Sequence, residues 1–253
     1  MQSEVKATKN IHNYSASSLG ILKNTPLFSK LSDKEIGCFY DASQHKSYEK
    51  GKILYLEEEP AKFFYVICSG WIKLFHTLSE GNEIIVDMIR AGHVLGAGNI
   101  FERGLHTSNA QVVEDVQLIS IPLSLLSKQI RLNSTLALNM LTYISRLYRR
   151  HCTEIALNST RSAPQRIGNF LLRLCPDGKK TGVVLHLPYD KTLIAHTLGM
   201  TRGSFSRALN ILRLKTSIRV IGTRVEIDST EQLASFVYGS LAIKPASEKS
   251  KPR

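Results

Sequence analysis

The stretch VVLHLPYDKTLIAHTLGMTRGSFSRALNILRLKTSIRVIGTRVEI, residues 183–227, decides the fold of the C-terminal half of the chain. Asp190 is a candidate cap for a helix that runs to about Thr197, and Thr201 is a candidate cap for a second helix. Gly199 lies between them, where a tight turn leaves little space for a side chain. Two helices joined in this way are typical of a helix-turn-helix.

The two predicted helices each have one apolar and one polar side. The inward positions are Ala195, Leu198, Phe205, Leu209 and Leu212. The outer face of the second helix carries short hydrogen-bonding groups and guanidinium groups, which suits insertion into the major groove of DNA. That face consists of Thr201, Arg202, Ser204, Ser206, Arg207 and Asn210.

Each polar residue of the second helix has a predicted role. Arg207 is the first candidate for a bidentate contact to guanine, and Arg202 is the second. Ser206 suits a base edge or a thymine methyl group. Thr201 and Ser204 suit phosphate oxygens, because free N–H groups at a helix N-terminus attract anions.

The segment SIRVIGTRVEI, residues 217–227, predicts a two-stranded hairpin, the wing, after the second helix. Arg219, Thr223 and Arg224 are candidates for phosphate contacts. Any single arginine here is equally compatible with a solvated surface charge. The combination of cap, glycine turn, basic helix and wing is what favours DNA binding.

Residues 48–121, toward the N-terminus, predict a β domain. Short runs of β-branched and aromatic residues are interrupted by glycine at positions 51, 70, 81, 92 and 96. Many short strands at this spacing predict an antiparallel sandwich or roll.

The pattern becomes helical after Pro122, and a long helix is predicted from about Ser134, its candidate cap, to Asn158. One apolar stripe consists of Leu136, Met140, Tyr143 and Leu147, and a second of Leu138, Leu141, Ile144, Tyr148, Cys152 and Ile155. A helix that is apolar on two faces needs two partners. One is its own β domain, and the other is the same helix of a second copy. The alternative is burial within one copy.

The predicted fold class is therefore α+β, with five parts. They are a flexible arm over 1–18, a β-roll sensor domain over 19–131, a dimerisation helix over 132–158, a winged helix-turn-helix over 159–239 and a basic flexible tail over 240–253.

The formal net charge of +12 is unevenly distributed. Residues 18–121 hold 10 basic and 13 acidic residues, a net charge of −3, whereas residues 156–239 hold 12 basic and 5 acidic residues, a net charge of +7. A basic C-terminal half predicts a polyanion partner for that half alone. The predicted helix-turn-helix indicates that this polyanion is double-stranded DNA.

Several other classes lack support in the sequence. No apolar run of about 18 residues and no apolar N-terminal stretch occur, so we expect a cytoplasmic protein without a membrane span. The four cysteines form no CxxC pair, and no metal site is predicted. HExxH, GxxxxGK and nucleophile–base–acid patterns are absent, so no enzyme is predicted.

The chain resembles the CRP/FNR superfamily of bacterial transcription regulators across nearly all of residues 24–238. The segments that carry the resemblance are PLFSKLSDKEI at 26–36, the β-domain glycines, the long helix, QRIGNFLLRL at 165–174 and LIAHTLGMTRGSFSRALNIL at 193–212. The resemblance implies a homodimer, a cyclic-nucleotide-binding-like β-roll and a palindromic operator with TTGA-like half-sites. GSFSRAL is most similar to the branch that regulates anaerobic, nitric-oxide or denitrification responses.

The sequence departs from this family where cyclic AMP would bind. Gly96-Ala97 stands in place of a Gly-Glu pair, His106-Thr107 or Thr107-Ser108 in place of Arg-Ser, and His151-Cys152 in place of Thr-Ser. The carboxylate for a ribose hydroxyl and the guanidinium for the cyclic phosphate are both missing. The predicted effector pocket still comprises Gly96, Ala97, His106, Thr107, Ser108, His151 and Cys152, but the sequence argues against cyclic AMP.

Other sensor chemistries stay open. The effector is unknown, and a regulator without any ligand or a haem- or gas-sensing one is compatible with the sequence. Candidate axial haem ligands are His93, His106, His151 and Cys152. An N-terminal cysteine cluster of the iron–sulfur members is missing. Gly203 replaces a glutamate of many relatives, so a changed half-site preference is expected.

The leading hypothesis is a homodimeric transcription regulator in which a signal at the β-roll shifts the central helices. Contact with RNA polymerase and repression by blocking a promoter are both compatible with it. A different class is a cyclic-nucleotide module that regulates another protein, which leaves the winged motif unexplained.

Overall fold

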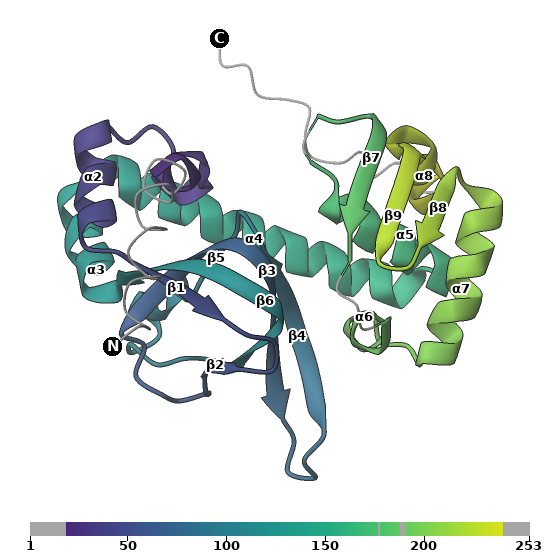
Figure 1. Ribbon diagram of the computed structural model, residues 1–253, viewed down its shortest axis with the longest axis horizontal. Helices are drawn as coiled ribbons and strands as arrows, with labels where there is room; N and C mark the ends of the chain where they lie inside the picture. The colour runs from purple at the N-terminus through teal and green to yellow at the C-terminus, as the bar shows by residue number, and fades with distance from the viewer. Residues whose placement is uncertain (1–18, 177, 188–190, 240–253) are drawn as a thin grey trace, which may run out of the picture. The chain divides into compact units, whose positions relative to one another are not determined.

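The computed structural model describes residues 19–176, 178–187 and 191–239, with the backbone alone at 157–159 (Figure 1). The chain divides into two compact units, residues 1–152 and 153–253. The predicted arm, the predicted tail and the predicted cap Asp190 lie outside the described residues. Within those residues, no helix is both long and apolar enough to cross a membrane.

An antiparallel sheet forms the centre of the N-terminal unit, as predicted (Figure 1). Its strands are β1 (Gln44–Tyr48), β2 (Ile53–Tyr55), β3 (Phe63–Thr77), β4 (Glu83–Arg90), β5 (Val94–Leu95) and β6 (Asn109–Pro122). The main path is β1-β6-β3-β4, with β2 paired to β6 and β5 to β3. Strand β3 is buried on both faces: Phe64 and Val66 belong to one apolar cluster, Tyr65 and Ile67 to another. The continuous apolar run at the start of β3 results from this double burial.

Short helical segments adjoin the sheet in the sequence. They are η1 (Pro26–Phe28), α2 (Asp33–Asp41), η2 (Ala97–Phe101) and α3 (Leu123–Leu132). Ser32 and Glu35 form a capping box at the start of α2. Gly70 is required in β3, because its φ is +80° and an added Cβ would lie 2.1 Å from the carbonyl oxygen of Asp115.

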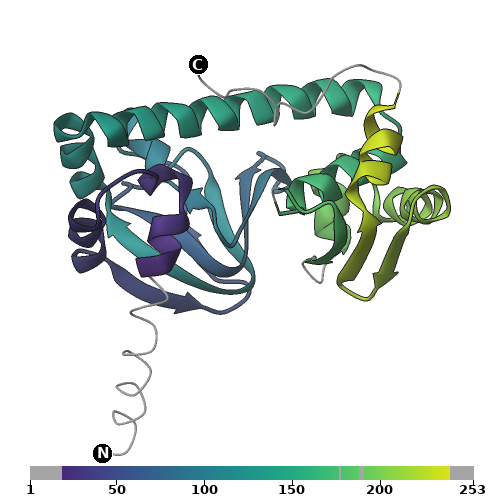
Figure 2. The same cartoon turned by 90° about the horizontal axis from the view of Figure 1, so that it is seen from above.

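The long helix α4 (Ser134–Thr160) is continuous (Figure 2). Its predicted cap was wrong by one residue: Asn133 Oδ1 accepts a hydrogen bond from Leu136 N at 3.1 Å, and Ser134 is already helical. Of the first predicted stripe, Leu136 and Met140 are buried in the core of the N-terminal unit. The second stripe is exposed, including 61% of Leu141 and 71% of Tyr148.

After the end of α4, the described residues of the C-terminal unit form four helices and a three-stranded sheet of order β7-β9-β8. The elements are α5 (Ala163–Leu174), β7 (Thr181–His186), α6 (Lys191–Thr197), α7 (Arg202–Lys215), β8 (Ile218–Ile221), β9 (Arg224–Ser229) and α8 (Thr230–Tyr238). The predicted hairpin is β8–β9. Strand β7, which pairs with β9, and helix α8 were not predicted.

Candidate nucleic-acid interface and sensor cavity

Helices α6 and α7 and the turn between them form the predicted helix-turn-helix. Gly199 has φ +60°, a left-handed conformation that favours glycine. Its N–H donates to His196 O at 2.9 Å, and Met200 N donates to Ala195 O at 3.0 Å. The turn is therefore closed by backbone hydrogen bonds on the last residues of α6.

An arginine of α5 forms a hydrogen bond to this turn. Arg166 Nη1 donates to the carbonyl oxygen of Leu198 at 2.9 Å, and it would lie 3.8 Å from a Cβ added at Gly199. Sequence reasoning missed this role, because Arg166 lies 32 residues before its acceptor. The only sequence signal was its place in the segment QRIGNFLLRL, which carried part of the family resemblance.

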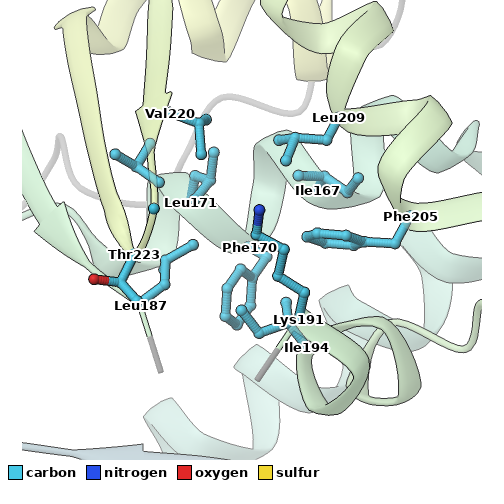
Figure 3. Close-up of a pocket in the computed structure, with 12 residues that line it drawn as sticks. Ile167, Phe170, Leu171, Leu187, Lys191, Ile194, Phe205, Leu209, Val220 and Thr223 are labelled. Atoms are coloured by element: carbon cyan, nitrogen blue, oxygen red, sulfur yellow. The ribbon is translucent and has the colours of Figure 1, made fainter. Parts of the chain in front are cut away.

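Apolar packing beneath α7 fixes the angle between the two helices. Ala195, Leu198, Phe205 and Leu212 are buried as predicted, and Leu209 is half-buried. Figure 3 shows Phe205 and Leu209 directed toward side chains of α5 and of the wing around a cavity of about 20 Å³. A cavity of this size holds at most one water molecule. We therefore treat it as a packing gap rather than a ligand site.

The outer face of α7 is exposed and carries no acidic residue. Arg202, Gly203, Ser206, Arg207 and Asn210 are exposed, and Ser204 is half-exposed. Helix α7 also carries Arg213 and Lys215 in its last turn. This face combines hydrogen-bonding groups with uncompensated positive charge, which is the chemistry of a base-reading helix.

The N-terminus of α7 is capped as predicted. Thr201 Oγ1 accepts a hydrogen bond from Ser204 N at 3.2 Å, and the Thr201 hydroxyl donates to Ser204 Oγ at 3.1 Å. The proton of Thr201 is therefore already used within the cap. The Ser204 hydroxyl keeps its own proton for an external acceptor such as a phosphate oxygen.

The wing arginines form ion pairs with acidic residues of β9. Arg224 Nη2 lies 2.8 Å from Glu226 Oε1, and Arg219 lies 3.7 Å from Glu226 and 3.4 Å from Asp228. Thr223 is half-buried, and its carbonyl accepts from Leu187 N. Both guanidinium groups remain partly exposed, so each can reach a phosphate, and the carboxylates compete with that phosphate for the arginine charge.

The N-terminal unit contains a cavity of about 180 Å³ between the sheet and α4. Most of its walls are apolar, and the polar side chains in the lining are Asp87, Asn99, Tyr143 and His151. Asp87 forms an ion pair with Arg150. The Tyr143 hydroxyl donates to Val94 O at 2.8 Å, and burial raises the pKa of Tyr143 to about 12.

The structure separates the residues of the predicted effector pocket. Gly96, Ala97 and His151 line the cavity, whereas His106, Thr107 and Ser108 do not, and Cys152 is exposed. His106 is buried elsewhere: its ring stacks on Tyr55 with centroids 3.5 Å apart, and its Nδ1 lies 2.9 Å from Asn99 Nδ2. Burial lowers the pKa of His106, which favours the neutral ring.

Both units match known families in the expected order. Residues 45–133 match the cyclic nucleotide-binding domain, and residues 165–236 match the Crp-like helix-turn-helix domain. Together with the exposed face of α7, these matches define the class: a DNA-binding transcription regulator with an N-terminal domain of cyclic-nucleotide-binding architecture.

The chain belongs to the CRP/FNR family. It is 25% identical to the cyclic AMP receptor protein of Thermus thermophilus, over 86% of this chain and 99% of the relative. It is 27% identical to the global nitrogen regulator of Synechococcus elongatus, over 77% of this chain and 90% of the relative. The structure of FixK2 from Bradyrhizobium japonicum is similar with a TM-score of 0.66 at 25% identity, covering 76% of this chain and 96% of that chain.

Proposed function

We propose that the protein acts as a homodimer that binds a palindromic operator, with one copy of α7 in each of two successive major grooves. The acid-free, exposed face of α7 is the observation that carries this proposal. Regulation follows from occupancy of the operator, either by contact with RNA polymerase or by blocking a promoter. We assign this action to the cytoplasm, where bacterial DNA lies, and propose no catalytic step.

The exposed stripe of α4 supports the homodimer. Leu141, Ile144, Tyr148 and Ile155 follow each other at intervals of three, four and seven residues, which is the heptad spacing of a coiled-coil seam. Three of these four side chains are more than half exposed. An exposed apolar stripe of this kind on a helix is suited to the same stripe of a second copy.

Residue roles follow the geometry of α7 and the wing. We assign base contacts to Arg207, Arg202 and Ser206, with Asn210 next along the same face. Phosphate contacts fall to Ser204 and Thr201 at the helix N-terminus and to the wing residues Arg219, Thr223 and Arg224. Thr201 contributes through its position beside the free N–H groups, since its hydroxyl serves the cap.

The cavity beside α4 is the proposed effector site. The family implies a cyclic nucleotide, but the lining does not fit one: Ala97 offers no carboxylate, and His106 is stacked on Tyr55 instead of facing the cavity. An apolar protein cavity of about 150 Å³ accommodates a ligand the size of benzene. A cavity of about 180 Å³ therefore favours a small, largely apolar effector over a nucleotide or haem.

The operator experiment tests the central proposal. Genomic fragments are selected with the purified protein, and binding to the enriched sequence is measured by fluorescence anisotropy at several salt concentrations. We expect a palindromic sequence, binding as a dimer and a steep loss of affinity with salt. Arg207→Ala should weaken binding by about 1–3 kcal/mol and relax base choice at one position of each half-site.

Arg213→Ala is the matched control, because Arg213 is an exposed arginine on a different side of the same helix. It should lower the affinity less and leave base choice intact. Equal effects of the two substitutions on base choice would contradict the assignment of Arg207. No enrichment of any fragment would contradict sequence-specific binding itself.

A further inference from the structure

A second cavity of the N-terminal unit lies between residues 23–30 and one face of α4. Its volume is about 490 Å³, within the usual range of ligand pockets. Three cationic side chains line it, Lys23, Lys30 and Arg146, and no carboxylate does. This cavity is distinct from the proposed effector site, although Tyr143 contributes to both linings.

The two walls of this cavity are fixed to each other. Leu22, Leu27 and Phe28 are almost fully buried and anchor the N-terminal segment in the core. Asn139 of α4 donates from Nδ2 to the carbonyl oxygens of Leu27 at 3.1 Å and of Ser29 at 2.5 Å. The cationic groups are therefore presented by a preorganised scaffold rather than by a loose surface segment.

Lys30 occupies a backbone conformation that lysine rarely adopts. Its φ is +61°, and it is the third residue of a turn closed by a hydrogen bond from Leu31 N to Phe28 O at 3.2 Å. Glycine or asparagine is usual at such a position, and another residue costs about 1–2 kcal/mol there. The chain thus carries a lysine at the cavity where glycine or asparagine would be more stable.

The positive charge of the cavity is largely uncompensated. Lys23 pairs with Asp33 at 2.8 Å, but Asp33 is outside the lining and highly exposed. No ion pair joins Lys30 or Arg146 to a carboxylate among the residues that the structure describes. The like charges of Lys30 and Arg146 therefore stay uncompensated at the cavity until an anion is bound.

Some of the neutral donors in the lining are already used within the protein. The Thr142 hydroxyl donates to Leu138 O at 2.8 Å, and Asn139 uses its amide on the two carbonyls of the N-terminal segment. The side chains of Asn24 and Ser29 can add hydrogen bonds, but the charge that holds a ligand comes from the lysine ammonium groups and the Arg146 guanidinium. Such binding needs more than one negative charge, because a single charge would satisfy only part of the cluster.

We propose that this cavity binds a small polyanion, a metabolite with at least two phosphate or carboxylate groups. Arg146 suits a bidentate contact to one such group, and Lys23 and Lys30 suit the second as point charges. The bound ligand would join residues 23–30 to α4 within one turn of the proposed dimer stripe. The proposal does not depend on operator binding.

Calorimetric titration of the full-length protein with pyrophosphate tests this proposal, with citrate as a parallel probe, both at constant ionic strength. We expect saturable binding of pyrophosphate, of citrate or of both. The difference between the two probes shows whether the cavity prefers phosphate or carboxylate groups. The double variant Lys30→Asn/Arg146→Gln should weaken it at least tenfold. Asparagine tolerates the left-handed conformation, so this variant should unfold at the wild-type temperature or above it.

A second double variant, Arg202→Gln/Arg207→Gln, separates this cavity from the DNA-reading face. It removes the same amount of charge from α7 and should leave the titration unchanged, although operator binding is lost. Failure of both probes to bind wild-type protein would overturn the proposal. Retained binding in the cavity variant, or loss in the α7 variant, would also overturn it.

Discussion

Glu226 of the wing is expected to weaken DNA binding, and Glu226→Gln should strengthen it. The carboxylate of Glu226 lies 2.8 Å from Arg224 and 3.7 Å from Arg219, the two wing arginines proposed to contact phosphates. This carboxylate competes with the DNA phosphates for both guanidinium groups. Glutamine keeps the size of the side chain and removes the charge that competes with the phosphates.

The magnitude follows from the exposure of these pairs. Exposed ion pairs contribute about 0.2–1 kcal/mol each, and Arg219 keeps a second partner in Asp228. We therefore expect Glu226→Gln to make DNA binding more favourable by about 0.5–1 kcal/mol per wing. This value is the lower part of the range for the two ion pairs of Glu226. Two wings in a homodimer give about 1–2 kcal/mol, or roughly 5–30-fold in Kd. The gain should shrink with salt, because salt screens exposed charges.

Fluorescence anisotropy on the selected operator measures this difference, with thermal unfolding as a check of the fold. Glu231→Gln is the matched control: its carboxylate pairs with Lys180 at 3.0 Å, and no wing arginine is released. The control corrects for the general loss of one negative charge. If Glu226→Gln folds normally but binds no more tightly than Glu231→Gln, the wing arginines do not exchange onto phosphates.

Three further predictions concern the N-terminal unit. Tyr148→Glu should weaken dimerisation, and sedimentation that shows an unchanged dimer would remove this stripe from the interface. Gly70→Ala should destabilise the fold by about 1–3 kcal/mol more than Gly81→Ala. Both glycines have positive φ, but only Gly70 closely faces a backbone carbonyl. Equal melting temperatures of the two variants would refute the clash. His106→Phe should reduce the loss of stability as the pH falls below the ordinary histidine pKa of 6.5. The lowered pKa of His106 means that the fold favours the neutral ring, so protonation of His106 destabilises the fold. Phenylalanine cannot be protonated and keeps the stack on Tyr55. Thermal unfolding between pH 5 and about 8 tests this, and an unaltered pH dependence would exclude a contribution from His106.

Local signals account for what could be predicted from the sequence. Gly199 and Thr201 have the conformation and the cap hydrogen bond that their residue types suggested, because both features depend on a few neighbouring residues. The cap of α4 shows the limit of such signals. Asn133 and Ser134 are both good capping residues, and only the path of the chain out of α3 selects the first.

Features that depend on distant partners could not be predicted. Arg166 bonds to the turn of the helix-turn-helix from another helix, and β7 is defined by pairing with β9 about 40 residues later. His106 shows the same limit for the sensor domain. Its place in the sequence suggested a pocket residue, whereas its actual surroundings are set by Tyr55 and Asn99. A family pattern aligns positions, but the packing of substituted side chains decides whether a position still faces the ligand.

Helix α4 contributes to both cavities and to the proposed dimer stripe, because its helical repeat directs different residues to different sides. Tyr143, Leu147 and His151 line the proposed effector cavity at four-residue intervals, and Asn139, Thr142 and Arg146 line the cationic cavity. The exposed stripe begins between them, at Leu141 and Ile144. Neighbouring residues on a helix are about 100° apart. Each residue of α4 that lines one of the two cavities therefore lies within one turn of a proposed dimer contact. We therefore expect a ligand in either cavity to act on the proposed dimer seam directly, through the orientation of this one helix.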